Sequence, residues 1–397
     1  SGKVSCNLLS DSDVQTLTLD GKKILAVIIP QATRKQRPVF LNNQPFSHTY
    51  KRLNDGYRLC DEETVRRMFA EQVENERDIR ILPHFGMDDI DMESLRIYRQ
   101  MLKDEKPGHP YLEQDDFAFL QSLRGWRRDR TTGKEGLTLA GLLMFGRWSS
   151  IQEAFPYYFL DYQEQPEAKT ELRWVDRLVP DGTWSGNLFD FYRRVYRKLI
   201  AELKVPFSIK NGQRKEDTPV HVALREALVN TLVHADYTGR LSVLVVKRPN
   251  MFGFRNPGGL RLPVEQVIRG GESDCRNRTL HQMFLLIGLG EGSGIPKLFS
   301  GWQSQHWRQP LLREKDLPEQ TLLELHMLDL LPESVLNTLR GLLQSQGRSR
   351  DKVYYLSGSA PVSPEQVFVS VTSSGNNNPS SGSNDPSSGS NDPSSGS

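Results

Sequence analysis

Residues 218–237 read Thr-Pro-Val-His-Val-Ala-Leu-Arg-Glu-Ala-Leu-Val-Asn-Thr-Leu-Val-His-Ala-Asp-Tyr. The spacing of the apolar residues in this stretch predicts a helix over 218–232. Glu226, Asn230 and His234 recur every four residues, so they share one face of this helix. Three polar residues at this spacing are typical of a solvated helix face. A carboxylate one turn from a carboxamide also suits a Mg²⁺-nucleotide site, because it offers oxygen ligands for a hard cation and a base for the attacking water.

Glycines follow this helix at places where a backbone can approach a phosphate. A hairpin is expected from strands at 242–247 and 251–255, followed by Asn256-Pro257-Gly258-Gly259, which by itself reads as a β-turn. The next features are a polar stretch at 270–278, a helix at 279–287 and alternating glycines, namely Gly288, Gly290, Gly292 and Gly294. Backbone N–H groups of such a loop, together with the following helix N-terminus, favour phosphate.

The order of these elements resembles the Bergerat (GHKL) ATP-binding fold of gyrases, heat-shock chaperones and histidine kinases. Residues 223–237, 255–260 and 292–296 resemble most closely the ATPase-like domain of bacterial RecG-like transcriptional regulators. Chains of that family begin with a Schlafen-type AlbA domain, and residues 20–30, 37–39 and 50–52 resemble its second half. Residues 138–146 resemble the family's connector.

The resemblance assigns roles to individual residues. It implies that Glu226 is the general base, that Asn230 is the Mg²⁺ ligand, and that Gly258 and Gly259 form the turn beneath adenine. By the same resemblance, Gly290, Gly292 and Gly294 form the phosphate loop.

Two other positions of the expected nucleotide site are less defined. Asn256 stands where the fold usually has an adenine-reading aspartate, and its carboxamide oxygen would accept the same hydrogen bond without charge assistance. His234 is either a partner near the phosphates or a packed histidine.

Charge and composition divide the chain of 397 residues. Lys and Arg number 51 and Asp and Glu 49, but residues 1–60 carry a net charge of +5 and residues 61–105 a net charge of −6. We expect an α/β (α+β) protein built from a truncated, β-rich AlbA-like module over 1–60, a helical connector over 61–150, a Bergerat-type α/β sandwich over 151–345, and a linker with a disordered low-complexity tail over 346–397.

Several shorter elements are also expected. Strands are predicted at 15–19 and 23–29, joined by an Asp-Gly turn. Helices are predicted at 62–75, 117–123 and 187–203, with the helical pattern of 117–123 continuing into 138–145. A short strand is expected at 366–371.

The sequence excludes some classes of protein. Cys6, Cys60 and Cys275 are too scattered for a disulfide framework or a zinc site. There is no apolar run long enough for a membrane span, and the N-terminus lacks the features of a signal peptide, so we expect a cytoplasmic protein without a membrane partner.

These features together predict an ATP-binding, DNA-associated regulator that uses ATP and Mg²⁺. The expected DNA contacts are the basic N-terminal block and the run Arg124, Arg127, Arg128 and Arg130, although such a run is often only a solubilising face. Two alternatives stay open. One is an ATPase or ATP-gated nuclease of a Schlafen-like system, and the other is a degenerate scaffold that only mediates dimerisation; a homodimer is compatible with each.

Overall fold

The computed structural model describes residues 3–30, 32–53, 56–73, 77–166, 174–201, 203, 208–210, 213–215, 218–271, 273–290, 294–305, 307–316, 318–328, 343–346 and 353–356. They belong to two units, residues 1–330 and 331–397. The second unit contains the hairpin of β15 (Leu343–Gln346) and β16 (Val353–Leu356). The expected strand at 366–371 and the repetitive tail lie outside the described residues.

The first unit is a mixed α+β fold organised around one six-stranded sheet, which confirms the expected fold class. Its strand order is β13-β14-β12-β11-β7-β8, with β7 and β11 parallel and all other neighbours antiparallel. The strands are β7 (Leu160–Glu164), β8 (Asp176–Leu178), β11 (Val243–Arg248), β12 (Met251–Pro257), β13 (Leu311–Asp316) and β14 (Glu319–His326).

The hairpin β11–β12 matches the predicted one. Val245 lies opposite Phe254 in the register, and Val243 and Phe252 lie two residues from them, so the four buried side chains share one face. This face of the hairpin contributes to the hydrophobic core of the unit.

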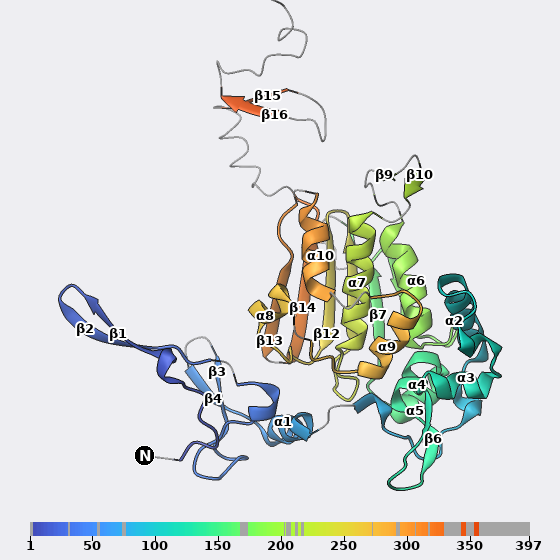
Figure 1. The fold of residues 1–397 in the computed structure, drawn as a ribbon, viewed down its shortest axis with the longest axis horizontal. Coiled ribbons are helices and arrows are strands. Elements are labelled where there is room, and N and C mark those ends of the chain that lie inside the picture. Colours follow the sequence, from blue (N-terminus) through green and yellow to red (C-terminus); the bar gives the residue numbers. More distant parts are fainter. Residues whose placement is uncertain are drawn as a thin grey trace, which may run out of the picture. The chain divides into compact units, whose positions relative to one another are not determined.

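Helices cover one face of the sheet (Figure 1). They are α6 (Leu188–Ile200), α7 (Pro219–Val233), α8 (Val264–Arg269), α9 (Arg278–Leu286) and α10 (Gly294–Gln303). The central helix is α7, which packs against α6, α9, α10 and β12. Thr218 caps it by accepting a hydrogen bond from the His221 N–H, and Pro219 stands in the first turn, where no N–H is needed. Trp302 is fully buried on α10.

A group of short helices extends this core. It consists of α2 (Met92–Glu105), α3 (Asp116–Ser122), α4 (Leu139–Phe145) and α5 (Trp148–Ala154). The predicted helical continuity from 117–123 into 138–145 was wrong. The hairpin of β5 (Trp126–Arg128) and β6 (Glu135–Leu137) separates α3 from α4, because Gly125 packs against Leu120 and Gly133 adopts a positive φ in the turn.

The helical group and the sheet share one continuous hydrophobic core. Tyr98 on α2 contacts Phe145 and Phe189 edge-on, and its hydroxyl donates a 2.6 Å hydrogen bond to the Met283 carbonyl on α9. The predicted boundary near residue 150 is therefore crossed by packed side chains.

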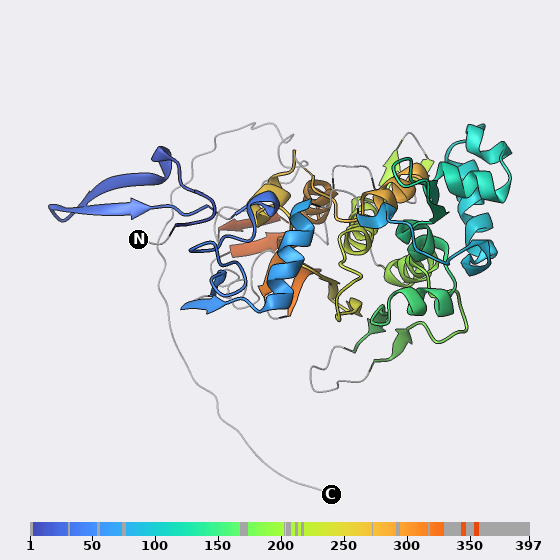
Figure 2. The same ribbon diagram turned by 90° about the horizontal axis from the view of Figure 1, so that it is seen from below.

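The first 73 residues form small sheets and a helix. The elements are β1 (Val14–Leu19), β2 (Lys22–Val27), β3 (Tyr50–Leu53), β4 (Gly56–Leu59) and α1 (Glu62–Val73). The predicted hairpin turn at Asp20-Gly21 is present, with both residues at positive φ. β1 and β2 form a long ribbon (Figure 2). The side chains of this ribbon are almost all exposed.

Shorter elements complete the described chain. The remaining strands are β9 (Ser208–Lys210) and β10 (Gln213–Lys215), and the 3₁₀ helices are Asp11–Asp13, Arg34–Gln36, Arg77–Ile79, Met87–Asp89 and Pro110–Glu113. Within the described residues, no helix has the length and apolar character that a membrane crossing requires.

Candidate functional site

A cavity of about 220 Å³ lies between α7, the end of β12, the segments 259–271 and 273–276 that include α8, the first turn of α10 and strands β13 and β14. We call it the central cavity. It brings together five of the residues that the sequence singled out, which are Asn230, His234, Asn256, Gly259 and Gly294. These residues span more than 60 positions in the sequence.

Glu226 and Asn230 form a hydrogen-bonded pair on α7. The Asn230 Nδ2 donates to the Glu226 carbonyl at 2.8 Å and to Glu226 Oε1 at 3.0 Å. Glu226 is 4% exposed, and burial raises the pKa of its carboxyl despite the hydrogen bond from Asn230. Since the amide nitrogen of Asn230 is engaged with Glu226, its oxygen is the atom available to a ligand.

Gly294 brings the start of α10 against this pair. Its φ is +46°, and a Cβ built on it would lie 3.7 Å from Glu226 Oε1 and 3.9 Å from Asn230 Oδ1. The N-terminus of α10 therefore lies beside Glu226 and Asn230, where its dipole favours an anion.

Asn256 and Thr321 lie side by side on the neighbouring strands β12 and β14. Both line the central cavity and both are buried. The Thr321 hydroxyl donates a 2.9 Å hydrogen bond to the Gly258 carbonyl, so it also fixes the glycine turn.

Glu226 does not itself line the central cavity, and two other predicted residues lie elsewhere. Gly258 borders a second cleft instead of the central cavity, and its φ of +89° places its Cα beside the Arg276 guanidinium. Gly290 lies against Val229 and Leu285 and does not line the central cavity. Gly292 lies outside the described residues.

His234 ends α7 at the wall of the central cavity. Burial and the nearby His281, Arg276 and Arg261 lower the pKa of its imidazole to about 3. The side chain is therefore neutral at pH 7, and it can donate or accept a hydrogen bond but cannot supply a positive charge to a phosphate.

This shift predicts a pH dependence of stability. An unfolded histidine titrates near pH 6.5. Below that pH the unfolded chain therefore binds a proton at His234, whereas the folded chain does not bind it until the pH approaches 3. The contribution of neutral His234 to the unfolding free energy is fully present above pH 6.5 and is lost as the pH falls from 6.5 toward 3. Between pH 7 and pH 5, we expect the unfolding free energy of the wild type to fall by up to about 2 kcal/mol more than that of His234→Gln. Urea titrations at both pH values test this, and equal losses would contradict it.

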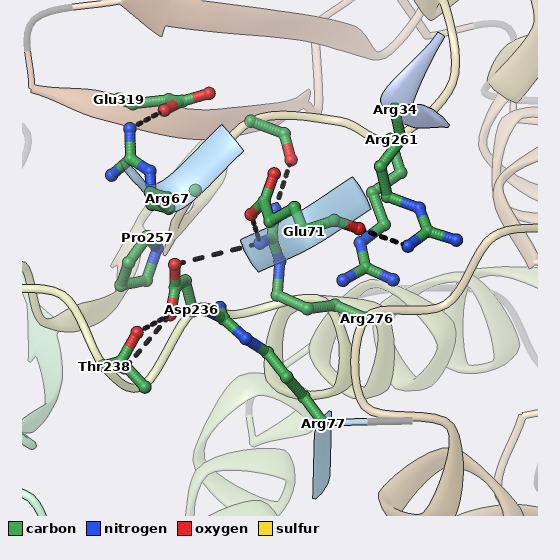
Figure 3. Close-up of polar contacts among 12 residues, drawn as sticks. Arg34, Arg67, Glu71, Arg77, Asp236, Thr238, Pro257, Arg261, Arg276 and Glu319 are labelled. Atoms are coloured by element: carbon green, nitrogen blue, oxygen red, sulfur yellow. Dashed lines mark hydrogen bonds and ion pairs between the residues drawn. The ribbon is translucent and has the colours of Figure 1, made fainter. Parts of the chain in front are cut away.

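A buried network of ion pairs adjoins the central cavity and centres on Arg276 (Figure 3). Arg276 is 3% exposed. Its Nη1 contacts the Glu71 carboxylate and lies 3.8 Å from Asp236 Oδ2. Its Nε donates to the His234 carbonyl at 3.1 Å, and its Nη2 donates to the Gly259 carbonyl at 2.9 Å. One side chain thus connects α1 with both the end of α7 and the glycine turn.

The carboxylates of this network are ionised. Burial would raise the pKa of Asp236, but Arg276, Thr238 and Arg77 outweigh it and hold the pKa below its usual value. Glu71 behaves in the same way, since Arg276 lowers its pKa against the effect of burial.

Further ion pairs join the N-terminal segment to the same region. Arg34 Nε lies 3.0 Å from Asp274 Oδ2 in the cavity-lining loop, and Arg67 on α1 contacts Glu319 at the start of β14. Arg34 also donates to the Glu71 carbonyl. The segment before residue 74 is therefore tied directly to the walls of the central cavity.

We expect Glu71→Ala to lower the unfolding free energy by about 2–4 kcal/mol, because it removes the carboxylate nearest to the buried Arg276. Glu63→Ala is the matched control. Glu63 is exposed on the same helix, and its loss should change the unfolding free energy by less than about 0.5 kcal/mol. Denaturant titrations measure both, and similar values for the two variants would show that the Glu71–Arg276 pair contributes little.

The sequence did not single out Arg261, Asp274, Arg276 or Thr321 as site residues. A charged residue in a polar loop carries no periodic signal that distinguishes burial from exposure. The basic run that was singled out lies apart, on and around β5, with Arg124, Arg128 and Arg130 exposed.

Comparison with known proteins gives little further information. Residues 66–161, which include α2 to α5, match a family described as a domain of unknown function (DUF8451). No curated protein matches the chain. A solved structure, that of the DIP2311 protein from Corynebacterium diphtheriae, is similar with 16% identity and a TM-score of 0.49 over 83% of this chain. The chain spans 62% of the length of that protein's chain.

Proposed function

We propose that this chain binds a Mg²⁺-nucleotide, ATP by resemblance, in the central cavity. The observation that carries the proposal is the meeting of Asn230, Asn256 and Gly294 at one cavity, at the places where the Bergerat resemblance expects metal, adenine and phosphate contacts. The placement of α7 across the sheet and of the glycine turn at the end of β12 also supports it.

The residues present fit a magnesium ion that is shared with phosphates. Within the described part of the chain, no group of three or more His, Cys, Asp or Glu side chains could hold a metal on its own. Mg²⁺ commonly takes one or two protein oxygens and completes its shell with phosphate oxygens and water. Asn230 Oδ1 would supply the protein oxygen, and the bound ion would neutralise phosphate charge.

Glu226 would supply the chemistry if the nucleotide is hydrolysed. Burial raises the pKa of its carboxyl, which makes its conjugate base a stronger proton acceptor. The hydrogen bond from Asn230 orients the carboxylate. Its carboxylate would take a proton from water as the water oxygen attacks the terminal phosphorus, the bond from that phosphorus to the bridging oxygen breaks, and ADP leaves.

Calorimetric titration of the full chain with ATP tests the proposal, in the presence and absence of Mg²⁺. We expect binding that requires the metal. If no heat of binding is measured at millimolar ATP with Mg²⁺, the nucleotide proposal is lost and the scaffold interpretation replaces it.

We further propose that nucleotide binding serves a cytoplasmic regulator that associates with DNA. The support is the basic N-terminal block and the exposed arginines around β5, which could contact phosphates.

The arginines predict a salt dependence. Replacing Arg127, Arg128 and Arg130 together with Ala should make the slope of log affinity against log salt less steep by about 2–3, because each lost phosphate contact removes about 0.9. Fluorescence anisotropy with a duplex at several salt concentrations measures the slope. The control replaces the exposed Lys103 and Lys106 with Ala, which should leave the slope unchanged. An unchanged slope in the arginine variant would remove this run from the DNA contact.

A further inference from the structure

Arg261 is buried without enough partners for its guanidinium. Its side chain is 3% exposed, and its Nη1 donates to Asp274 Oδ1 at 3.3 Å and to the Cys275 carbonyl at 3.4 Å. Its Nε and Nη2 are buried and have no hydrogen-bond partner among the residues that the structure describes. Buried donors without partners carry a large desolvation cost, so their presence needs an explanation.

Several guanidinium groups gather around Arg261. Among the described residues, the guanidinium groups of Arg276 and Arg34 act against the charge of Arg261, and the carboxylates of Asp274 and Glu71 act in its favour. Figure 3 shows the guanidinium groups of Arg34 and Arg261 next to one another. Burial, with Arg276 as the next largest influence, lowers the pKa of Arg261. The surroundings thus disfavour the positive charge that Arg261 nonetheless carries at neutral pH.

Arg261 also lines the central cavity, together with Arg276, Ser273 and the Gly270–Gly271 backbone. An anion that enters the cavity would find the unpartnered Nε and Nη2 donors of Arg261, and the guanidinium groups of Arg261 and Arg276 would attract its charge. A tetrahedral oxyanion suits this geometry, because arginine offers two parallel N–H groups to two oxygens.

We propose that Arg261 binds a phosphate group in the central cavity through its free Nε and Nη2. The phosphate is either part of the nucleotide, in which case this assignment rests on the proposed function, or a free anion. The opposing explanation is that Arg261 only holds the loop through Asp274.

Calorimetry with inorganic pyrophosphate and no metal tests the assignment on the full chain. We expect the wild type to bind pyrophosphate and Arg261→Gln to bind it 10- to 100-fold more weakly, the range for hydrogen bonds to a charged group. Arg261→Lys, which keeps the charge but loses the paired donors, should fall between them. Equal affinities of the wild type and Arg261→Gln would overturn the proposal, and so would a wild type that does not bind pyrophosphate.

Arg255→Gln is the matched control. Arg255 on β12 also has a buried Nε without a partner, but it does not line the central cavity. Its replacement should leave pyrophosphate affinity unchanged, and an equal loss in Arg255→Gln would indicate a general charge effect and overturn the assignment. Thermal melting shows whether each variant is folded. We expect Arg261→Gln to melt within a few degrees of the wild type, whereas a purely structural arginine would lower the melting temperature and leave binding unaltered.

A second set of titrations identifies the source of the phosphate and separates this proposal from the nucleotide proposal. If the phosphate belongs to the nucleotide, Arg261→Gln lowers the affinity for ATP but not that for adenosine, and pyrophosphate competes with ATP for binding. If the anion is free, both ligands bind together. Pyrophosphate binding without ATP binding would support the role of Arg261 while the proposed function fails. If ATP binds equally to the wild type and to Arg261→Gln, and pyrophosphate does not bind, the nucleotide proposal stands and the role of Arg261 is wrong.

Discussion

Asn230→Ala is expected to abolish metal-dependent nucleotide binding, with an affinity loss of 100-fold or more in calorimetry. The amide oxygen of Asn230 is the protein oxygen proposed for Mg²⁺, and the described residues offer no cluster of acidic side chains to replace it. The same substitution frees the Glu226 carboxylate from its hydrogen-bonded partner. Both effects act at the phosphate end of the central cavity.

The control for this experiment is Asn250→Ala. Asn250 lies in the turn between β11 and β12, at the opposite end of β12 from Asn256, and its backbone carbonyl accepts a hydrogen bond from the Met327 N–H. Nucleotide affinity should be unchanged in this variant. If Asn230→Ala also binds Mg²⁺-ATP with wild-type affinity, the metal role of Asn230 is wrong and α7 presents only a polar helix face.

Glu226→Gln should lower the rate of ATP hydrolysis by roughly 10²- to 10⁴-fold while nucleotide binding survives. Glutamine keeps the oxygen that accepts from Asn230 but cannot take a proton from water. A phosphate-release assay and calorimetry on the same preparation separate the two effects.

Glu265→Gln on the exposed surface of α8 is the matched substitution and should hydrolyse ATP at the wild-type rate. Hydrolysis by Glu226→Gln at the wild-type rate would exclude Glu226 as the base. If the wild type binds ATP without hydrolysing it, the proposal of an ATP-binding regulator is retained and the ATPase alternative is excluded.

The local pattern of the sequence was sufficient for the elements that build one side of the central cavity. Apolar spacing predicted α7 and α9, and alternation with a Pro-Asn turn predicted β11–β12. In each case the signal lies within about 15 neighbouring residues, where helix and strand periods differ clearly. Asn230 and Gly294 stood out in these local patterns and Asn256 through the family resemblance, and the structure brings the three together at the cavity.

The opposite side of the cavity could not be predicted in this way. β13 and β14 follow no motif that was recognised, although Thr321 on β14 lies beside Asn256. Gly290 was placed in the phosphate loop by the alternating glycines and the family resemblance, but its neighbours are Val229 and Leu285. The burial of Arg276 depends on Glu71, which is 205 positions away in the chain. No pattern among neighbouring residues indicates so distant a partner.

The pair of Glu71 and Arg276 also constrains how this chain can change through evolution. A sequence that lost the acidic residue at position 71 and kept Arg276 would leave this buried guanidinium with Asp236 but without Glu71. A sequence that lost the arginine would leave the two buried carboxylates of Glu71 and Asp236 facing each other. Neither single step is neutral. Positions 71 and 276 should therefore covary among relatives of this chain, with a charge lost at both or at neither.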